Sequence, residues 1–248
     1  MDIKRSLERW QSSLMSSIPV AGLFARNPVV YKWKSLFRVW MLRETVAWRV
    51  VDLLTQSLLL HELRHSLGAR ILLRSSFETV ATLIYLNQQM GAVVEGDVSF
   101  GDFGEMTSKL LLGSRTNPSG PKSLNIISVL EKCDRVYPGI GALYADLSES
   151  AHPSFEGLSF GYSKIDHKEF ETHFRNRWGE LHAVKHPDQM VLCMETFDRE
   201  YNLVWPDRTT KLEEWIEAND ERLEAEWGAG VGDQTPTAIT PPLSGASR

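Results

Sequence analysis

Two long stretches of helical periodicity, at residues 29–60 and 62–89, constrain the fold of this chain more than any other feature. Their apolar side chains recur every three or four residues, which is the spacing of one face of an α-helix. They are Leu36, Val39, Trp40, Val46, Val50, Leu53, Leu54 and Leu58 in the first stretch and Leu63, Leu67, Ile71, Phe77, Ala81 and Ile84 in the second. Residues 79–86 are apolar almost all round, which is typical of a helix buried on every side. The pattern predicts that the second helix lies at the centre of a helical protein.

The remaining sequence predicts three regions: an N-terminal helix or arm at residues 1–27, a helical domain at 28–227 and a disordered tail at 228–248. Asn27-Pro28 marks the first boundary, and the tail is rich in Gly, Ala, Pro, Thr and Ser. Within the domain, residues 91–104 hold four glycines and predict a loop, whereas residues 168–182 predict a helix. No pair of strands is evident. We therefore expect an all-α fold, a single helical bundle with two long antiparallel helices and a disordered C-terminal tail.

Charge is unevenly distributed along the chain. Residues 1–75 carry twelve Lys and Arg against five Asp and Glu, and residues 195–227 carry four against eleven. The net charge of −5 argues against a generally basic nucleic-acid-binding protein. Either the two oppositely charged regions pack on each other or have solvated faces, or the basic region forms a face for a phosphate-bearing partner.

The cysteine content and the hydropathy pattern bear on location. Cys133 and Cys193 stand in apolar helical patterns, so we expect two buried free thiols rather than a disulfide framework or a zinc site. The N-terminus lacks the apolar core of a signal peptide. The apolar runs are far shorter than the roughly 20 residues that span a bilayer. We expect a reduced, cytoplasmic protein without a membrane partner.

Residues 144–154, Tyr-Ala-Asp-Leu-Ser-Glu-Ser-Ala-His-Pro-Ser, concentrate reactive side chains in a short predicted helix. The helix is expected to end before Pro153, because proline restricts the residue that precedes it. Tyr144, Ser148 and His152 fall at i, i+4 and i+8 and predict a polar face that also carries Glu149. The structural alternative is a C-terminal histidine that interacts favourably with the helix dipole.

Arg70, Arg74 and Glu78 repeat the same spacing on the predicted central helix. Glu78 lies one turn from Arg74 and can form an ion pair with it. A charged pair among apolar neighbours is costly unless it belongs to a site or to a polar network. Both an ordinary helical ion pair and a functional site remain open, and we expect this row to face Tyr144, Ser148 and His152 across a cleft.

Two further motifs suggest other chemistry. His61-Glu-Leu-Arg-His65 matches the H-E-x-x-H pattern of zinc peptidases, but Arg64 lies between the ligands and no third ligand is evident. Arg175 and Arg177 precede His182 at the loose spacing of R-x(4–6)-H ribonuclease motifs. In such a pair the histidine accepts a proton from a ribose hydroxyl and the arginine stabilises the phosphorane.

Residues 74–86 and 144–154 together resemble a group of uncharacterised bacterial helical proteins that look like distant relatives of the HEPN superfamily. The resemblance covers about residues 30–200 and is specific only in these two motifs. It implies a helical bundle, frequent dimerisation, and either RNA cleavage or a non-catalytic binding role in defence and toxin systems. His152 departs from the ribonuclease pattern, because no arginine lies four to six residues before it.

The expected site is a polar cleft without a metal or a cofactor, lined by Arg74, Glu78, Tyr144, Ser148, Glu149 and His152. We expect an RNA- or nucleotide-directed HEPN-like protein, as a metal-independent ribonuclease or a defence-system component, with RNA or nucleotide and a second copy of itself as partners. The alternative is a non-catalytic binding or assembly module whose polar cluster is structural, for which replacing His152 would lower the melting temperature. A zinc hydrolase at His61 and His65 is the third hypothesis.

Overall fold

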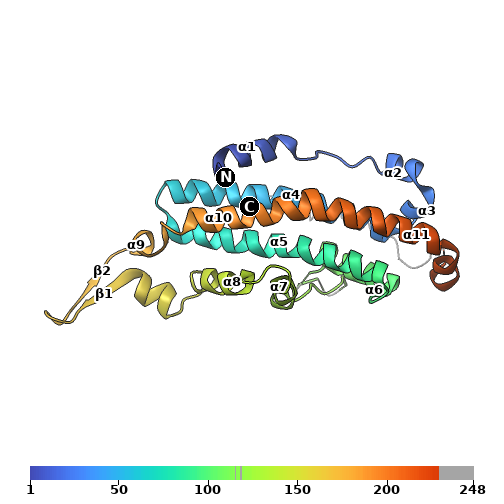
Figure 1. The fold of residues 1–248 in the computed structure, drawn as a ribbon. Helices are drawn as coiled ribbons and strands as arrows, with labels where there is room; N and C mark the ends of the chain where they lie inside the picture. Colours follow the sequence, from blue (N-terminus) through green and yellow to red (C-terminus); the bar gives the residue numbers. More distant parts are fainter. Residues whose placement is uncertain (115, 118, 229–248) are drawn as a thin grey trace, which may run out of the picture.

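The computed structural model describes residues 1–114, 116–117 and 119–228, and the predicted tail from residue 229 onward lies outside the described residues. The chain is mostly helical, as predicted (Figure 1). The α-helices are α1 (Ile3–Ser13), α2 (Val20–Arg26), α3 (Pro28–Tyr31), α4 (Lys34–Glu62), α5 (Ser66–Glu95), α6 (Phe100–Leu112), α7 (Ile126–Asp134), α8 (Ile140–Glu149), α9 (Trp178–His182), α10 (His186–Arg199) and α11 (Trp205–Trp227). Two π-helical segments, η1 (Phe155–Phe160) and η2 (Glu200–Val204), and two strands, β1 (Ser163–Asp166) and β2 (Glu171–Phe174), complete the fold.

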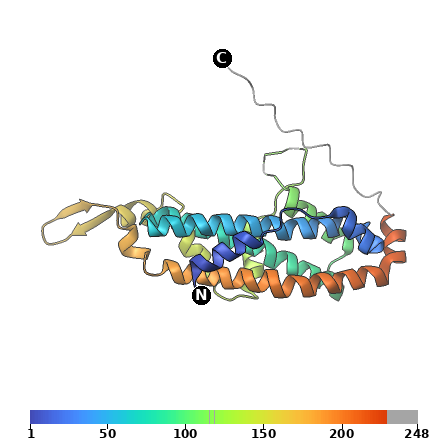
Figure 2. The ribbon, with the colours of Figure 1, turned by 90° about the horizontal axis from the view of Figure 1, so that it is seen from above.

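Helix α5 lies at the centre of the helical body. It contacts α4 along its length and also packs against α6, α7, α8, α10 and α11 (Figures 1 and 2). Within the apolar segment at residues 79–86 every residue except Thr82 is buried. The prediction of a central buried helix is therefore confirmed, because a segment that is apolar on all sides removes most surface from water when helices cover each side.

Residues 186–227 form one almost unbroken helix. Helix α10 passes through the π-helical segment η2 directly into α11, and Pro206 is the second residue of α11. A proline inside a helix usually breaks or kinks it, but here the structure shows a change of helical geometry instead. We attribute this to the wider π turn, which relieves the contact between a proline ring and the carbonyl of the preceding turn.

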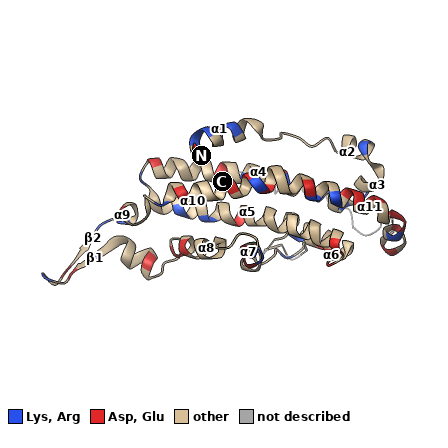
Figure 3. Ribbon diagram, in the orientation of Figure 1, with Lys and Arg blue, Asp and Glu red and all other residues tan. Residues whose placement is uncertain are grey.

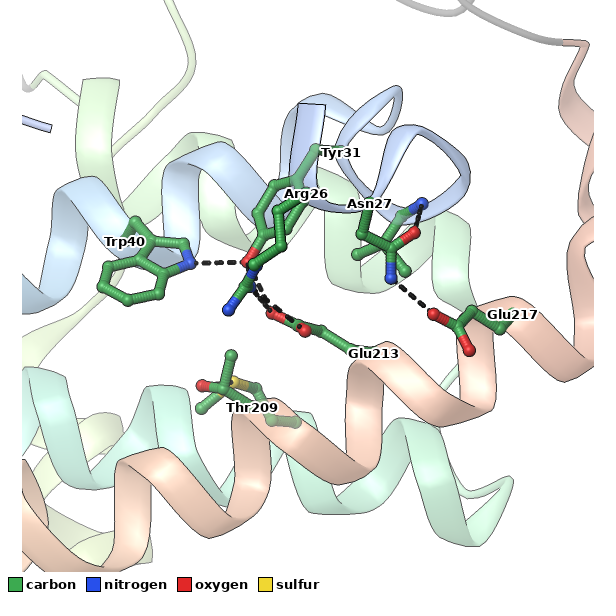
Figure 4. A network of polar contacts seen from close by, with 9 residues as sticks. Arg26, Asn27, Tyr31, Trp40, Thr209, Glu213 and Glu217 are labelled. Carbon is green, nitrogen blue, oxygen red and sulfur yellow. Dashed lines mark hydrogen bonds and ion pairs between the residues drawn. The ribbon is translucent and has the colours of Figure 1, made fainter. Parts of the chain in front are cut away.

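The basic N-terminal region packs on the acidic C-terminal helix. Arg26 and Tyr31 both contact the carboxylate of Glu213, and Lys32 forms ion pairs with Asp220 and Glu224 at 2.7 and 2.6 Å. Figure 4 shows the centre of this cluster, where the indole of Trp40 donates to Tyr31 Oη at 3.0 Å and Asn27 donates to Glu217. Figure 3 shows that acidic residues are spread along α11. The interpretation that the basic and acidic regions pack on each other is thus confirmed.

Residues 163–174 form an antiparallel hairpin that the sequence does not predict. Ser163 pairs with Phe174 and Asp166 pairs with Glu171, and the hairpin projects from the end of the helices (Figure 1). Arg177, which is buried, donates to the carbonyls of Phe160 and Ser163 at 3.0 and 2.7 Å and so closes the base of the hairpin. The expectations of a helix over 168–182 and of a fold without strands are therefore wrong.

Two further predictions concern the burial of the cysteines and the ability of a helix to span a membrane. Cys133 and Cys193 are both buried and free, as predicted. None of the helices in the described part of the chain combines the length and the apolar character needed to cross a membrane.

Candidate functional site

Four of the six predicted site residues meet between α5 and α8. Arg74 Nε donates to Ser148 Oγ at 2.9 Å, and Arg74 Nη2 donates to Tyr144 Oη at 2.6 Å. The Tyr144 hydroxyl donates to Glu78 Oε1 at 2.8 Å, and the same carboxylate oxygen lies 3.1 Å from Arg74 Nη2. The i, i+4 spacing on both helices brings these groups face to face, as the sequence predicts.

A second set of contacts continues this row toward the start of α5. Arg70 is 1% exposed, donates from Nε to Ser150 Oγ at 2.7 Å, and donates from Nη2 to the carbonyl and the carboxylate of Asp146 at 3.0 and 2.9 Å. Sequence reasoning singled out Arg70 but missed Asp146 and Ser150, because their polar side chains do not show which residue they face. We call the combined row the polar seam, and it comprises Arg70, Arg74, Glu78, Tyr144, Asp146, Ser148 and Ser150.

The polar seam is largely satisfied by its own hydrogen bonds. Burial and the hydrogen bond to Glu78 raise the pKa of Tyr144, so its hydroxyl keeps its proton and remains a donor at neutral pH. Arg74 stacks over the Tyr144 ring, with 4.9 Å between Cζ and the ring centroid, and pairs with Glu78. Charges that are paired and hydrogen-bonded in this way tolerate partial burial. The arrangement holds α8 against α5.

Glu149 and His152 lie outside the polar seam. Glu149 is exposed and accepts a hydrogen bond from Ser154 Oγ at 2.9 Å. His152 follows the end of α8, and its exposed ring forms no hydrogen bond or ion pair with the residues that the structure describes. The expected convergence of His152 with Arg74 and Glu78 is therefore not observed in these contacts. A histidine after the last helical turn faces solvent unless a neighbouring element covers it.

Of the polar seam, Glu78 lines an open hollow of about 480 Å³ between α4, α5 and α6. Thr79 and Thr82 of α5 and Thr45 and Arg49 of α4 contribute the other polar groups. Arg49 Nε donates to Thr79 Oγ1 at 3.2 Å. Arg74, Tyr144 and Ser148 are not among its lining residues. Glu78 is therefore the one residue of the polar seam that lines this hollow.

The H-E-x-x-H motif does not lie on one helix. Helix α4 ends at Glu62, Arg64 has a left-handed φ of 62°, and α5 begins at Ser66. His61 instead stacks on His186, with 4.9 Å between the ring centroids. No three His, Cys, Asp or Glu within the described ranges are arranged to hold a metal ion. The zinc-hydrolase hypothesis lacks the single helical face that it requires.

His186 is a buried histidine that sequence reasoning did not consider. Its Nε2 lies 3.1 Å from Ser57 Oγ, and the residue is 2% exposed. Burial, together with the nearby His61 and Arg70, lowers the pKa of His186 to about 4. Its ring is thus uncharged at neutral pH. No local signal could identify it, because Ser57 and His61 lie on α4, far away in the sequence.

The charge of Arg70, rather than of Arg175 or Arg177, acts on His182. Arg175 and Arg177 both form ion pairs with Glu180, at 2.8 and 3.4 Å, and Arg177 also holds the hairpin base. The His182 ring stacks on Trp178, with 5.3 Å between the centroids. Burial and then the positive charge of Arg70 lower the pKa of His182 to about 4. Both arginines of the loose sequence motif thus pair with Glu180.

The structure thus contains a polar seam between α5 and α8 and, beyond α8, a hairpin with exposed apolar side chains. The chain matches no known family model, no curated protein and no solved structure. The chemistry of the chain has to be inferred from its own residues.

Proposed function

We propose that this chain is a single helical bundle, built on the antiparallel pair α4 and α5, that acts as a non-catalytic assembly module. Its binding element is the hairpin arm, residues 155–174, and the partner is a second copy of the chain. One observation carries the proposal: Phe170, at the tip of the arm, is 93% exposed and has a left-handed φ of 54°.

Phe170 is costly for a folded monomer in two respects. A bulky residue in the left-handed region is strained by roughly 1–2 kcal/mol, and turns normally place Gly or Asn there. Burial of its ring does not offset this strain, because the ring is exposed. Strain at an exposed apolar side chain supports a role in binding, since contact with a partner would remove the ring from water.

The strand register gives the arm one apolar face and one polar face. Ile165, Thr172 and Phe174 alternate with Lys164 and His173, so the two sets point to opposite sides of the hairpin. Ile165 is 57% exposed and Phe174 is 82% exposed. A two-stranded hairpin is marginally stable by itself, and added strands or an apolar cover would stabilise it.

The exposed apolar area of the arm approaches the size of a stable interface. Phe155, Phe160, Phe170 and Phe174 are 72, 40, 93 and 82% exposed. At about 200 Å² for each ring they present roughly 500–600 Å², and Leu158 and Ile165 add to it. A standard interface buries roughly 800 Å² on each partner. Two arms in contact would reach this order.

The charge of the arm favours a second copy over nucleic acid or an anionic membrane. Residues 155–174 carry Lys164 and Lys168 against Glu156, Asp166, Glu169 and Glu171, a net charge of −2. A segment with a small negative charge is not attracted to a polyanion, and two copies of it repel each other only weakly. Twofold pairing of one surface with itself is also the commonest arrangement in homo-oligomers.

The polar seam has a structural role in this proposal. It fixes α8 on α5, and α8 leads through residues 150–154 into η1 at the base of the arm. On the other side Arg177 holds the base and Trp178 lies against Gly161, where a β-carbon would be 2.6 Å from the indole nitrogen. The arm is therefore held at both ends, by α8 before it and by Arg177 and Trp178 after it.

Sedimentation velocity across a concentration series tests the proposal. We expect the wild-type chain to form dimers and a variant with Ile165→Thr and Phe174→Ser, on the apolar face, to remain monomeric. The matched control, with Lys164→Thr and His173→Thr, changes the same two strands on the polar face and should still dimerise. A wild-type chain that is monomeric up to its solubility limit contradicts the proposal, as does equal loss in both variants.

A second candidate, an RNA-directed HEPN-like activity, is favoured by the position of His182. Its ring is uncharged at neutral pH and lies close enough to Arg70 and Asp146 for their charges to shift its pKa. An uncharged imidazole accepts a proton from a hydroxyl, and a guanidinium stabilises a phosphorane. If this candidate is right, purified protein cleaves RNA and His182→Gln abolishes cleavage, whereas His152→Ala retains it. RNA left intact by the wild-type protein contradicts it.

A further inference from the structure

A second hollow, of about 280 Å³, lies where the start of α4 meets α6 and the end of α11. It is at the opposite end of the helical body from the hairpin arm (Figure 1). Its volume is close to the lower end of the range for small-molecule sites. It belongs neither to the polar seam nor to the arm, so an inference about it stands apart from the proposed assembly.

Aromatic rings form its walls. The ring of Trp33 packs edge-on against Phe100, with 5.4 Å between the centroids, and Trp227 also lines the hollow. Trp227 lies directly over Gly101, where a β-carbon would be only 2.3 Å from the indole. Glycine at this position therefore lets the indole reach the hollow. Trp227 nevertheless remains 49% exposed, which leaves an indole surface open to a ligand.

Basic side chains and a helix start lie on one side of the hollow. Lys34 and Arg38, one turn apart on α4, both line it, and Glu105 is the one acidic residue among its lining residues in the described part of the chain. The first turn of α4 carries no acidic residue and its N-cap, Trp33, provides no side-chain cap. Such a helix start favours an anion, because its amide groups and dipole present positive charge.

Two donors beside the hollow lack acceptors. Trp33 is 9% exposed, and its buried indole N–H finds no acceptor within the described part of the chain. Within the same residues, the amide of Ser35 in the first turn of α4 donates to no group. Lys32 also lines the hollow and pairs with Asp220 and Glu224, and Arg38 Nη1 donates to the carbonyl of Gly104 at 3.3 Å. Unsatisfied donors at a basic, aromatic hollow indicate a ligand with acceptor oxygens.

We propose that this hollow binds a nucleoside monophosphate. Its base stacks on the open face of Trp227, and its phosphate lies at the start of α4 within reach of Lys34 and Arg38. An aromatic wall recognises a flat ring of any base, whereas the cations and free amides recognise the phosphate. The volume accommodates one nucleotide unit rather than a strand of nucleic acid.

Calorimetric titration of the full chain at low salt tests the ligand class. The probes are the four common ribonucleoside monophosphates, the matching nucleosides and inorganic phosphate. At least one monophosphate should bind about tenfold more tightly than both its nucleoside and inorganic phosphate, because only it uses both halves of the site. Absence of binding by all four overturns the proposal. Equal binding of inorganic phosphate overturns it as well, since the aromatic wall would then contribute nothing.

Matched substitutions test the place of binding. Arg38→Gln and Trp227→Leu should each weaken monophosphate binding by about tenfold or more, because each removes one recognised group. The controls are Lys211→Gln, on α11, and Trp48→Leu, whose indole is 47% exposed, and neither residue lines the hollow. Thermal melting checks that each variant is folded. Equal weakening by the controls, or unchanged binding in folded Arg38→Gln and Trp227→Leu, overturns the assignment.

Gly101→Ala provides a test that removes none of the recognising side chains but moves one of them. Its β-carbon displaces the Trp227 ring and should weaken nucleotide binding while inorganic phosphate binding stays the same. If this variant fails to fold, the Trp227→Leu variant carries the same test. Parallel loss of nucleotide and phosphate binding in either folded variant would contradict a separate role for the aromatic wall.

Discussion

The guanidinium of Arg70, on α5, donates to both the backbone carbonyl and the carboxylate of Asp146, on α8, at 3.0 and 2.9 Å. Arg70 is 1% exposed, whereas the side chain of Asp146 is 48% exposed. Removal of one partner therefore costs a different amount of stability in each case. Asp146 can be hydrated when Arg70 is absent, whereas the buried Arg70 cannot be hydrated when Asp146 is absent.

Asp146→Ala should destabilise the protein more than Arg70→Met. Removing Asp146 leaves a buried guanidinium with a weakened set of partners, and we expect a cost of about 2 kcal/mol after allowing for the solvent around the carboxylate. Arg70→Met removes the buried charge itself, which should cost less. Urea denaturation of the two variants and of the double variant measures the difference. The reverse order would show that Arg70 is held mainly by other contacts.

Tyr144→Phe should lower the free energy of unfolding by about 1–2 kcal/mol, whereas His152→Ala should change it by less than about 0.5 kcal/mol. The Tyr144 hydroxyl accepts from Arg74 and donates to Glu78, while His152 is exposed and makes no such contacts. This is the opposite of the sequence-based expectation for the structural alternative, in which replacing His152 lowers the melting temperature. Thermal melting of both variants is the measurement, and a large loss in His152→Ala would contradict the observed contacts.

Acid should destabilise the protein through His186. Its pKa in the folded state is about 4, below the value of 6.5 for an unperturbed histidine, so the unfolded state binds the proton more readily. The stabilising contribution is present above pH 6.5 and is lost as the pH falls from 6.5 toward 4. By pH 4 the loss is about 3 kcal/mol.

Denaturation of His186→Gln at a series of pH values checks this dependence. The variant should be less stable than the wild type at pH 7 but should lose less stability between pH 6.5 and 4. His167→Gln, at the exposed tip of the hairpin arm, is the control and should follow the wild-type profile. Identical profiles for the wild type and His186→Gln would contradict the prediction.

Phe170→Gly should separate folding from assembly. Glycine adopts the left-handed conformation without strain, so the melting temperature should stay the same or rise, by an amount worth up to about 1 kcal/mol. Dimerisation should weaken, because the variant lacks the most exposed ring of the arm. Melting and sedimentation of the same preparation give both values. A variant that dimerises as well as the wild type would exclude Phe170 from the interface.

The central helix and part of the polar seam could be predicted from local pattern alone. Residues 79–86 are apolar on all sides, and any packing that removes them from water places α5 at the centre. Arg74, Glu78, Tyr144 and Ser148 share a four-residue spacing, which puts them on facing rows whenever the two helices are neighbours.

Local pattern failed where distant residues decide the conformation. Residues 91–104 contain four glycines, yet α5 continues to Glu95 and α6 begins at Phe100, with Ser99 accepting from the amide of Asp102. Burial of Phe100 and Phe103 offsets the helix penalty of the glycines, and Trp227 requires Gly101 to be small. The hairpin was missed for a similar reason, since Arg177 holds its base through backbone carbonyls that carry no sequence signal.

By itself the sequence determined a mostly helical chain and the position of its central helix, because periodicity is a local quantity. It left the packing of the basic region on the acidic region as one of several alternatives. Only the tertiary structure decided that His61 meets His186, that His182 lies near Arg70, and that Trp227 lies over Gly101. Each of these pairs joins elements far apart in the chain. Their contacts depend on how helices cross and where a turn redirects them, and these relationships leave no periodic signal in the sequence.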